Sequence, residues 1–451
     1  MNQLLIRNAV IIGGGPAGLA PVIAACRSGQ IRELLAAGLT IVDQSPRLGA
    51  GDIGRYHINS DSLAETFLSC IEGETDPRLA ALRDHPATLA VAQYRGGAVP
   101  LQLVGEFLTI VGMAIHAIVE YSPGGAVLAG YQAICTQMVD DGLWLTRVRC
   151  LRDGAEKLLL SRSVVLATGA MQPPERLRQE IVAGVPLLPH YADKLMQSGE
   201  LMTPQGLAEV ARRLRSVREP KVAIVGGSQS ALASAHALLN YLPDVAFGAG
   251  GVSLLHRRDL RVTYDSAAAA QAEGYLEFGP DDICPLSGRV FRLGGFRLES
   301  RELVMRARGI GGRPPEPRLS LHRLRGADDP EAAHMLAEAD LIVAALGYRP
   351  RALPVLGLRG EPIKLHAQTL DMLPMVDGEC RVLDAAGQPL PQLFGIGLAA
   401  GFVPRGRLGG EPSFAGQANG LWLWQNDVGA MIVNALLGAS SLVSASSVFL
   451  R

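Results

Sequence analysis

A short glycine-rich stretch near the start of the chain places the strongest limit on its fold. The apolar residues Ala9–Ile12 run directly into the pattern Gly13-x-Gly15-x-x-Gly18, and a segment of small residues follows. This order predicts a buried strand, a tight turn and the first turn of a helix. Because Gly15 has no Cβ, a pyrophosphate can approach the backbone there and meet the free N–H groups of the helix. The stretch predicts a dinucleotide site, and a glycine turn without a ligand is the alternative.

A second apolar run, Leu39–Asp43, follows after a helix-length segment and ends in an acid. A carboxylate at the end of the second strand suits a ribose hydroxyl, so Asp43 is assigned to the nucleotide. The next residues, 44–54, form a loop rich in turn formers that leads to Arg55–Asp61. This loop either borders a flavin ring or is a surface connection, and the sequence leaves both readings open.

The opening pattern recurs near the middle of the chain. Residues 221–231 again read as strand, glycine turn and helix, with small residues in Gly226-x-Ser228-x-x-Ala231. The following strand, 252–256, ends in Arg257 and Arg258, where the first unit has Asp43. An arginine at this position pairs with a 2′-phosphate that an aspartate would repel. We therefore expect NADPH rather than NADH in the second unit, with a solvated basic pair as the alternative.

Three later apolar runs end in small residues: 163–169, 339–348 and 392–401. They complete the sheets that the two glycine turns begin, so the fold class is α/β with two Rossmann-like dinucleotide-binding domains. Two such units in one chain imply two nucleotide cofactors, and the economical chemistry is hydride transfer from a nicotinamide to a flavin. We therefore expect an NADPH-binding domain that is inserted into an FAD-binding domain. We expect the first part of the FAD domain at 1–200, the inserted NADPH domain at 201–338, and the second part with a C-terminal helix at 339–451. That helix is expected over about 414–437 and carries a core stripe, Leu421, Trp424, Val428, Met431 and Ile432.

Composition narrows the functional classes. The formal net charge of −1 gives no electrostatic reason to expect nucleic acid or an anionic membrane as partner. The six cysteines form no CxxC pair, which argues against a disulfide framework or a metal site. No signal peptide precedes the first strand, so we expect a cytoplasmic protein. The high apolar fraction is compatible with a homo-oligomer. The most apolar stretch, 98–119, is interrupted by polar residues and reads as a buried or amphipathic helix rather than a membrane span.

The chain resembles the flavoproteins with two dinucleotide-binding domains. It is most similar to the single-component (class B) flavin monooxygenases, especially the branch that N-hydroxylates lysine or ornithine. The resemblance lies in the first glycine turn and in the stretches Ala167–Gly169, Gly226–Ser230, Asp281–Phe291 and Ala345–Tyr348. One departure is Ala399–Phe402, where related reductases often carry Gly-Asp to hold the flavin ribityl chain.

This resemblance implies FAD and NADPH as cofactors and a monooxygenase activity. NADPH would reduce FAD, oxygen would add at flavin C4a, and the hydroperoxide would transfer one oxygen atom to a soft nucleophile. An amine nitrogen of a small metabolite is the favoured target, and a sulfide is another. The chemistry needs no protein nucleophile, so no catalytic residue is assigned. The alternatives are an NAD(P)H oxidase or reductase of the same fold and a flavin-binding protein without catalysis.

The predicted cofactor-binding residues lie in the two turns, at the ends of the strands and in the loop after Asp43. Arg405 and Arg407 follow the last strand in a glycine-rich loop; they are open to three readings, as contacts to reduced flavin, to an acidic substrate, or as solvated charges. The predicted cofactor residues are Gly13, Gly15, Pro16, Ala17, Gly18, Asp43, Gln44, Tyr56, Asn59, Thr168, Gly169, Gly226, Ser228, Gln229, Ser230, Arg257, Arg258, Gly347, Tyr348 and Gly397.

Overall fold

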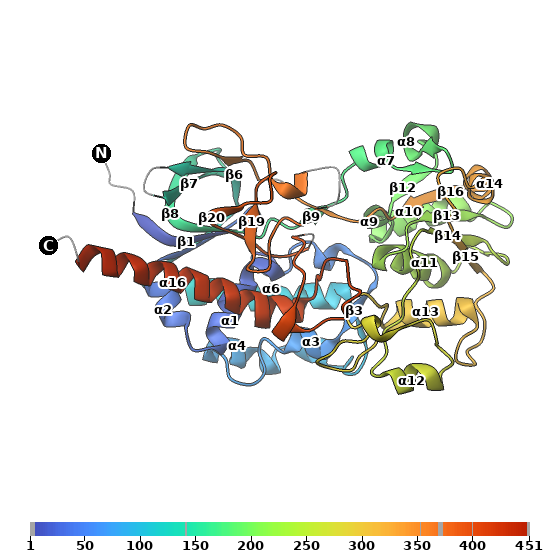
Figure 1. Cartoon of the computed structure of the whole chain (residues 1–451), viewed down its shortest axis with the longest axis horizontal. Coiled ribbons are helices and arrows are strands. Elements are labelled where there is room, and N and C mark those ends of the chain that lie inside the picture. Colours follow the sequence, from blue (N-terminus) through green and yellow to red (C-terminus); the bar gives the residue numbers. More distant parts are fainter. Residues whose placement is uncertain (1–4, 140–141, 352, 369–372, 399, 449–451) are drawn as a thin grey trace.

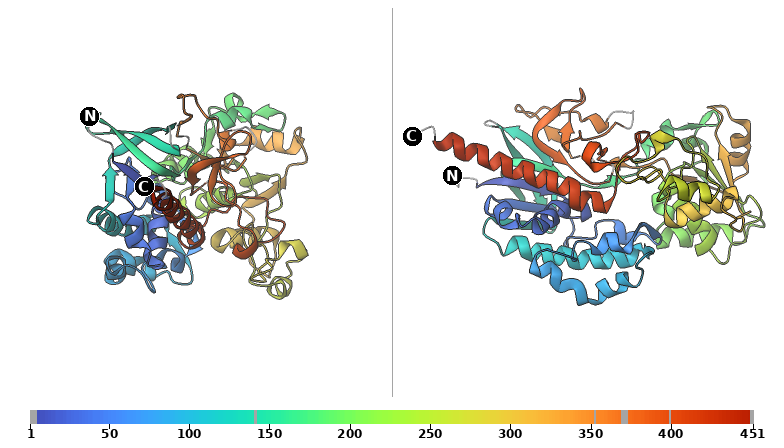
Figure 2. Two further views of the ribbon diagram at one scale, coloured as in Figure 1. Left: turned by 60° about the vertical axis from the view of Figure 1, so that its left-hand side comes forward. Right: turned by 60° about the horizontal axis from the view of Figure 1, so that its bottom comes forward.

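The computed structural model describes residues 5–139, 142–351, 353–368, 373–398 and 400–448. Two lobes lie side by side, each built around a sheet with parallel strands and flanking helices (Figure 1, Figure 2). The first lobe contains both ends of the chain, and the second is formed by the middle of the sequence. The predicted α/β fold with an inserted second domain is confirmed.

The first sheet is organised around β1 (Ile6–Ile12), which lies parallel to β2 (Leu39–Asp43) and β8 (Glu156–Leu166). Both faces of these strands are covered, which is why they read as continuous apolar runs. The first half of β8 pairs with an antiparallel meander and its second half with β1 and β20 (Pro389–Gly395). The other strands of this sheet are β5 (Gly125–Ala129), β6 (Tyr131–Val139), β7 (Leu143–Cys150), β18 (Val355–Leu356) and β19 (Arg381–Leu383).

Helices α1 (Pro16–Arg27) and α6 (Leu101–Glu120) cover the first sheet, and the C-terminal helix α16 (Gly429–Val448) packs on α1. Of the described helices, α6 is the one long and apolar enough to cross a membrane by length and composition. One face of this helix, including Phe107 and Ile115, is buried in the core of the first domain, whereas Met113 is exposed. Shorter elements of this domain are α2 (Ile31–Ala36), β3 (Asn59–Leu63), α3 (Ala64–Leu68), α4 (Pro77–Ala80), α5 (Pro86–Ala92) and β4 (Ala98–Pro100).

The second sheet has five parallel strands in the order β12-β16-β13-β14-β15. Along the chain, the first strand of this sheet is β12 (Leu195–Gln197) and the last is β16 (Leu341–Ala344). The sheet therefore includes residues on both sides of the predicted range 201–338. An apolar strand does not reveal which of two sheets it joins, and β16 pairs with β13 (Val222–Val225) rather than with the first sheet. The remaining elements are β14 (Val252–His256), β15 (Leu319–Arg323), α7 (Glu175–Gln179), α8 (Leu187–His190), α9 (Ser198–Leu201), α10 (Pro204–Leu214), α11 (Gln229–Tyr241), α12 (Ala267–Ala272), α13 (Leu298–Arg308) and α14 (Pro330–Glu338).

Two chain segments connect the domains and run next to each other. β9 (Ala170–Met171) leaves the first domain and pairs antiparallel with β17 (Arg349–Pro350), which returns to it. The N–H of Arg351 donates to the carbonyl of Gly169 at 2.9 Å, which extends this short ladder. The crossing is therefore a two-stranded ribbon.

The C-terminal helical segment starts later than predicted, at Leu421 rather than near residue 414. It begins with α15 (Leu421–Leu423), continues through a π-helical turn at Trp424–Val428, and then becomes α16. Gly416 and Gly420, with their low helix propensity, lie in the part that does not form helix. The apolar stripe is confirmed as core, since Leu421, Trp424, Val428 and Ile432 are buried and Met431 packs against them.

A loop from the first domain, 402–420, is clamped onto the second by Glu411. Its carboxylate accepts from the N–H of Leu293 at 3.0 Å and from that of Gly294 at 2.7 Å, and Glu411 is buried.

The change Glu411→Ala is expected to destabilise the protein by about 1–3 kcal/mol, because it leaves these donors without an acceptor. Thermal unfolding measures the effect. Glu411→Gln retains one acceptor oxygen and should lose less. The exposed Glu379→Ala is the control, and equal midpoints for all variants would contradict the clamp.

Candidate functional site

The first glycine turn joins β1 to α1, and its glycines have different reasons to be there. Gly13 has φ +108°, and a Cβ on it would lie 2.1 Å from the carbonyl oxygen of Ala167. A Cβ on Gly18 would lie 1.8 Å from the carbonyl oxygen of Gly13. These two glycines are required by backbone packing alone, as the fingerprint predicts.

Gly15 differs because the protein itself leaves room beside it. Its backbone is extended, with φ −77° and ψ −174°, and the nearest atom to an added Cβ is Gly51 Cα at 3.5 Å. The space that a Cβ would fill lies directly before α1, which begins with Pro16 and Ala17. A pyrophosphate fits this cradle, where the helix presents free N–H groups and the positive end of its dipole.

Asp43 lies at the rim of the same turn. Its Oδ2 accepts from the N–H of Gly14 at 2.5 Å, and its Oδ1 accepts from the N–H of Ser45 at 2.6 Å. Burial raises the pKa of Asp43, and the two N–H groups only partly offset it. A ribose hydroxyl that donates to this carboxylate would replace the hydrogen bonds to water that are lost on burial, and it would stabilise the charged form of Asp43. The adjacent Gln44 is exposed.

The loop after Gln44 packs between the turn and α6. A Cβ on Gly49 would lie 1.9 Å from the carbonyl oxygen of Leu108, and one on Gly105 would lie 2.5 Å from Gly54 Cα. Gly51 lies beside Gly15. The glycines of the loop therefore allow close contact with α6, and the loop borders the cradle instead of running over a remote surface.

The ends of two more strands complete this edge of the first sheet. Thr168 and Gly169 follow β8, and the Oγ1 of Thr168 donates to the carbonyl of Arg351 at 3.0 Å. Gly397 follows β20, and a Cβ on it would lie 2.9 Å from the Cβ of Ala17. The predicted FAD residues of the turn and of both strand ends are thus brought together. Ala399, where the missing aspartate was noted, lies outside the described residues.

Tyr56, Asn59 and Tyr348 lie at the junction of the domains. Burial raises the pKa of Tyr348, and the nearby Tyr56 adds to this shift. Asn59 Nδ2 donates to Glu299 Oε1 on α13 at 2.5 Å. These predicted cofactor residues therefore connect the domains, a role that their sequence positions did not indicate. Gly347, with φ +83°, directly precedes Tyr348.

The second glycine turn joins β13 to α11. A Cβ on Gly226 would lie 2.3 Å from the carbonyl oxygen of Ala345, which repeats the constraint found at Gly13. Ser228 occupies the place that Gly15 has in the first turn, and its Oγ lies 3.3 Å from that of Ser230. Gln229 Nε2 donates to Ser300 Oγ on α13 at 2.9 Å, so its amide holds the turn against that helix.

The two arginines after β14 are in different environments. Arg257 Nη1 lies 2.6 Å from Glu180 Oε1, and its Nη2 donates to the carbonyl of Ile181 at 3.0 Å. Arg176 also pairs with Glu180, at 3.2 Å. Arg258 is exposed and has no ion pair within the described part of the chain. Glu180 could not be found from the sequence, because a single acid in a linker forms no recognisable pattern.

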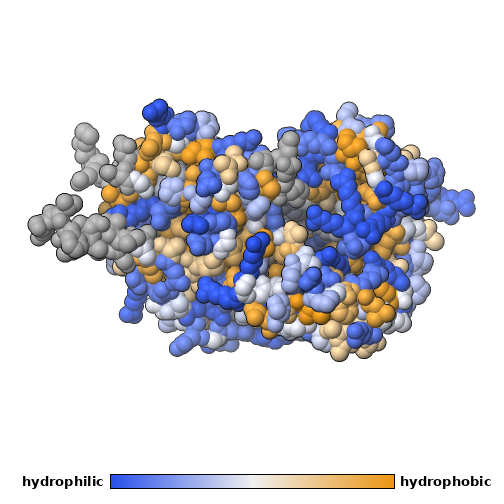
Figure 3. All heavy atoms as spheres, viewed as in Figure 1, coloured by the Kyte–Doolittle hydropathy of each residue, from blue (hydrophilic) through white to orange (hydrophobic). Residues whose placement is uncertain are grey.

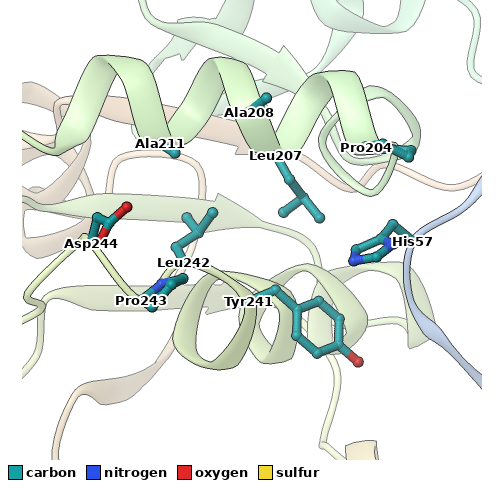
Figure 4. Close-up of a pocket in the computed structure, with 9 residues that line it drawn as sticks. All are labelled: His57, Pro204, Leu207, Ala208, Ala211, Tyr241, Leu242, Pro243 and Asp244. Carbon is teal, nitrogen blue, oxygen red and sulfur yellow. The ribbon is translucent and has the colours of Figure 1, made fainter.

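A hollow of about 320 Å³ lies between α10 and the last residues of α11. It is at the end of α11 opposite Gln229, and the predicted cofactor residues do not line it (Figure 4). His57 from the first domain closes one side and stacks edge-on against Tyr241, with ring centroids 5.7 Å apart. This hollow is distinct from both nucleotide turns. Across the described ranges, no cluster of His, Cys, Asp and Glu could hold a metal ion, and the six cysteines are free and buried.

Comparison with known proteins identifies the family, although no family model matches the chain. The chain is 33% identical over 435 residues to the CMP-5′-(3-aminopropyl)phosphonate hydroxylase of Streptomyces rubellomurinus. This alignment covers 95% of the chain and 97% of the relative.

Solved structures share the fold. The ornithine hydroxylase of Pseudomonas aeruginosa is 14% identical with a TM-score of 0.54, over 96% of this chain and 100% of that one. The ornithine N-hydroxylase of Kutzneria sp. 744 is 15% identical with a TM-score of 0.52, and the match covers 96% of this chain and 99% of that one. That structure was solved with reduced FAD, NADP⁺ and L-ornithine. The predicted resemblance is confirmed. The chain belongs to the family of the CMP-5′-(3-aminopropyl)phosphonate hydroxylase, and it has the fold of the ornithine N-hydroxylases.

Proposed function

We propose that this enzyme N-hydroxylates a primary amine of a small metabolite. The observation that carries the proposal is the match over nearly the whole chain to a hydroxylase whose named substrate is an aminopropylphosphonate. The net reaction consumes the amine, O₂, NADPH and a proton, and yields the hydroxylamine, NADP⁺ and water. FAD, when bound, supplies the redox chemistry that activates oxygen.

The residues of this chain have binding and positioning roles in that reaction. Gly15 and the start of α1 would hold the FAD pyrophosphate, and Asp43 would accept from its ribose. The second turn and Arg258 would hold NADPH. Tyr56 of the first domain would lie near Tyr348, where the chain returns from the second domain. The near-zero net charge gives no electrostatic reason for a nucleic-acid or anionic-membrane partner. We place the enzyme in the cytoplasm, and a homo-oligomer is compatible with this proposal.

The coupling of NADPH oxidation to product tests the proposal. The FAD-loaded enzyme is supplied with 3-aminopropylphosphonate, its CMP derivative, ornithine, lysine and alkyl sulfides. NADPH consumed, hydrogen peroxide and hydroxylamine are measured together. We expect most of the NADPH to appear as hydroxylamine with at least one amine. Peroxide as the sole product with every compound would overturn the proposal and favour an NADPH oxidase or reductase.

A further inference from the structure

We propose that Arg292, Arg297 and Arg407 form an anion subsite at the domain junction, which binds the phosphonate or phosphate group of the amine substrate. The inference rests on the proposed function and names the substrate class more closely. The tetrahedral phosphoryl group is the shared chemistry. It could also come from NADPH, and the experiment below separates these two sources.

The subsite lies where the loop 402–420 of the first domain meets residues 280–297 of the second. Arg292 Nη1 donates to the carbonyl of Leu408 at 3.0 Å, and Ser413 Oγ donates to Asp282 Oδ1 at 2.5 Å. The Sγ of Cys284 accepts from the N–H of Gly410 at 3.3 Å. The Asp281–Phe291 motif noted in the sequence is therefore the surface on which this loop docks. In the space-filling view, hydrophilic residues border the waist between the two lobes (Figure 3).

Arg297 is the most informative of the three. It is partly buried at the start of α13, and its Nη2 donates to the carbonyl of Arg292. Burial lowers the pKa of Arg297, against the effect of the nearby Asp61. A guanidinium stays charged in proteins, and a buried charge is costly unless it is paired. We therefore expect an anion to lie beside the Arg297 guanidinium.

Asp61 and Glu411 act on Arg297 from a distance, but no carboxylate among the described residues lies within ion-pair distance of it. Within the described ranges, neither Arg292, Arg297 nor Arg407 has an ion pair within 4.0 Å, whereas their neighbour Arg301 pairs with Glu273 at 2.8 Å. Both oxygens of Glu411 accept from backbone N–H groups, so that acid is already occupied.

Arg407 directly precedes Leu408, whose carbonyl accepts from Arg292 at 3.0 Å, so the loop 402–420 brings it to the same junction; Asp427, on the π-helical turn, lies there too. Burial raises the pKa of Asp427, while Arg292 and Arg407 act to lower it, so both arginines lie near this carboxylate. Within the described ranges, neither Arg292 nor Arg407 makes an ion pair with Asp427 within 4.0 Å, so the junction keeps a positive charge that is open to a ligand. A phosphoryl dianion suits it, because planar guanidinium groups donate in pairs to phosphate oxygens.

Two variants of the FAD-loaded enzyme, Arg297→Gln and Arg407→Gln, test the subsite. With 3-aminopropylphosphonate we expect the KM for the amine to rise by roughly tenfold or more, since charge-assisted bonds are lost. The kcat and the KM for NADPH should change little. Inorganic phosphate should compete with the amine in the wild type and compete less in both variants. Arg407 is exposed, so its variant should fold. Arg297→Lys, which keeps the charge, should recover part of the affinity. Arg152→Gln is the control, because that side chain is 88% exposed and remote.

The possible outcomes separate this inference from the proposed function. An unchanged KM for the phosphonate amine in both glutamine variants overturns the subsite, even if hydroxylamine forms. A rise in the KM for NADPH instead assigns the arginines to the cofactor and also overturns it. Arginine-dependent binding of 3-aminopropylphosphonate, measured by calorimetry, supports the subsite even if no hydroxylamine is made, in which case the proposed function fails alone.

Discussion

The change Gly15→Ala is expected to weaken FAD binding by roughly tenfold or more while the apoprotein keeps its fold. The protein alone tolerates a Cβ at this position, since the nearest atom is 3.5 Å away and the backbone is extended. A pyrophosphate held against the start of α1 would occupy the same space, and losing 1.4 kcal/mol of binding corresponds to a factor of about ten. The Kd for FAD, from titration of apoprotein by flavin fluorescence, and the unfolding midpoint of the apoprotein test the two halves of this prediction.

Two other glycines provide the matched controls. In Gly18→Ala the new Cβ would lie 1.8 Å from the carbonyl oxygen of Gly13, so the turn and the fold should be lost together. In Gly248→Ala nothing lies within 4 Å of the Cβ, so FAD affinity and stability should stay unchanged. An unchanged Kd in a stable Gly15→Ala protein would mean that the pyrophosphate does not pass over Gly15.

The parts of the site that the sequence predicted are those with local causes. Gly13 and Gly226 are each required by a carbonyl at the end of a neighbouring strand, and that constraint leaves a glycine in a fixed place after an apolar run. Asp43 also has a local cause, because it is the last residue of the apolar strand β2. Short-range rules of this kind need no knowledge of the rest of the fold.

The parts that could not be predicted depend on contacts between distant segments. Tyr56 meets Tyr348, and Asn59 meets Glu299, only because the inserted domain folds back against β3. The boundaries of the inserted domain lie outside the predicted range 201–338 for a similar reason. Hydrophobicity indicates that a strand is buried, but it does not indicate which strand it pairs with. The contact made by Glu411 could not be predicted from a sequence pattern either. Its carboxylate accepts from backbone N–H groups, which are present in almost every residue.

The change Arg258→Ala is expected to raise the KM for NADPH by roughly tenfold or more and to leave the KM for NADH nearly unchanged. A charge-assisted hydrogen bond to a phosphate is worth about 1.5–3 kcal/mol, and NADH lacks the 2′-phosphate. Arg257→Ala should have a smaller effect on NADPH, since Arg257 is already paired with Glu180 at 2.6 Å. Initial rates with both cofactors measure the ratio, and an equal change for NADPH and NADH would contradict the assignment.

Glu180 adds a second, opposite expectation at the same site. In the structure its carboxylate neutralises Arg257 and Arg176, so it competes with any phosphate for these arginines. Glu180→Gln should therefore free Arg257 and lower the KM for NADPH severalfold, with little change for NADH. Glu175→Gln, an exposed acid on the same helix, is the control. If Arg257→Ala removes the gain made by Glu180→Gln, the competition is direct. If the double variant keeps the gain, the effect comes from repulsion between the acid and the phosphate, and Arg258 alone holds the 2′-phosphate.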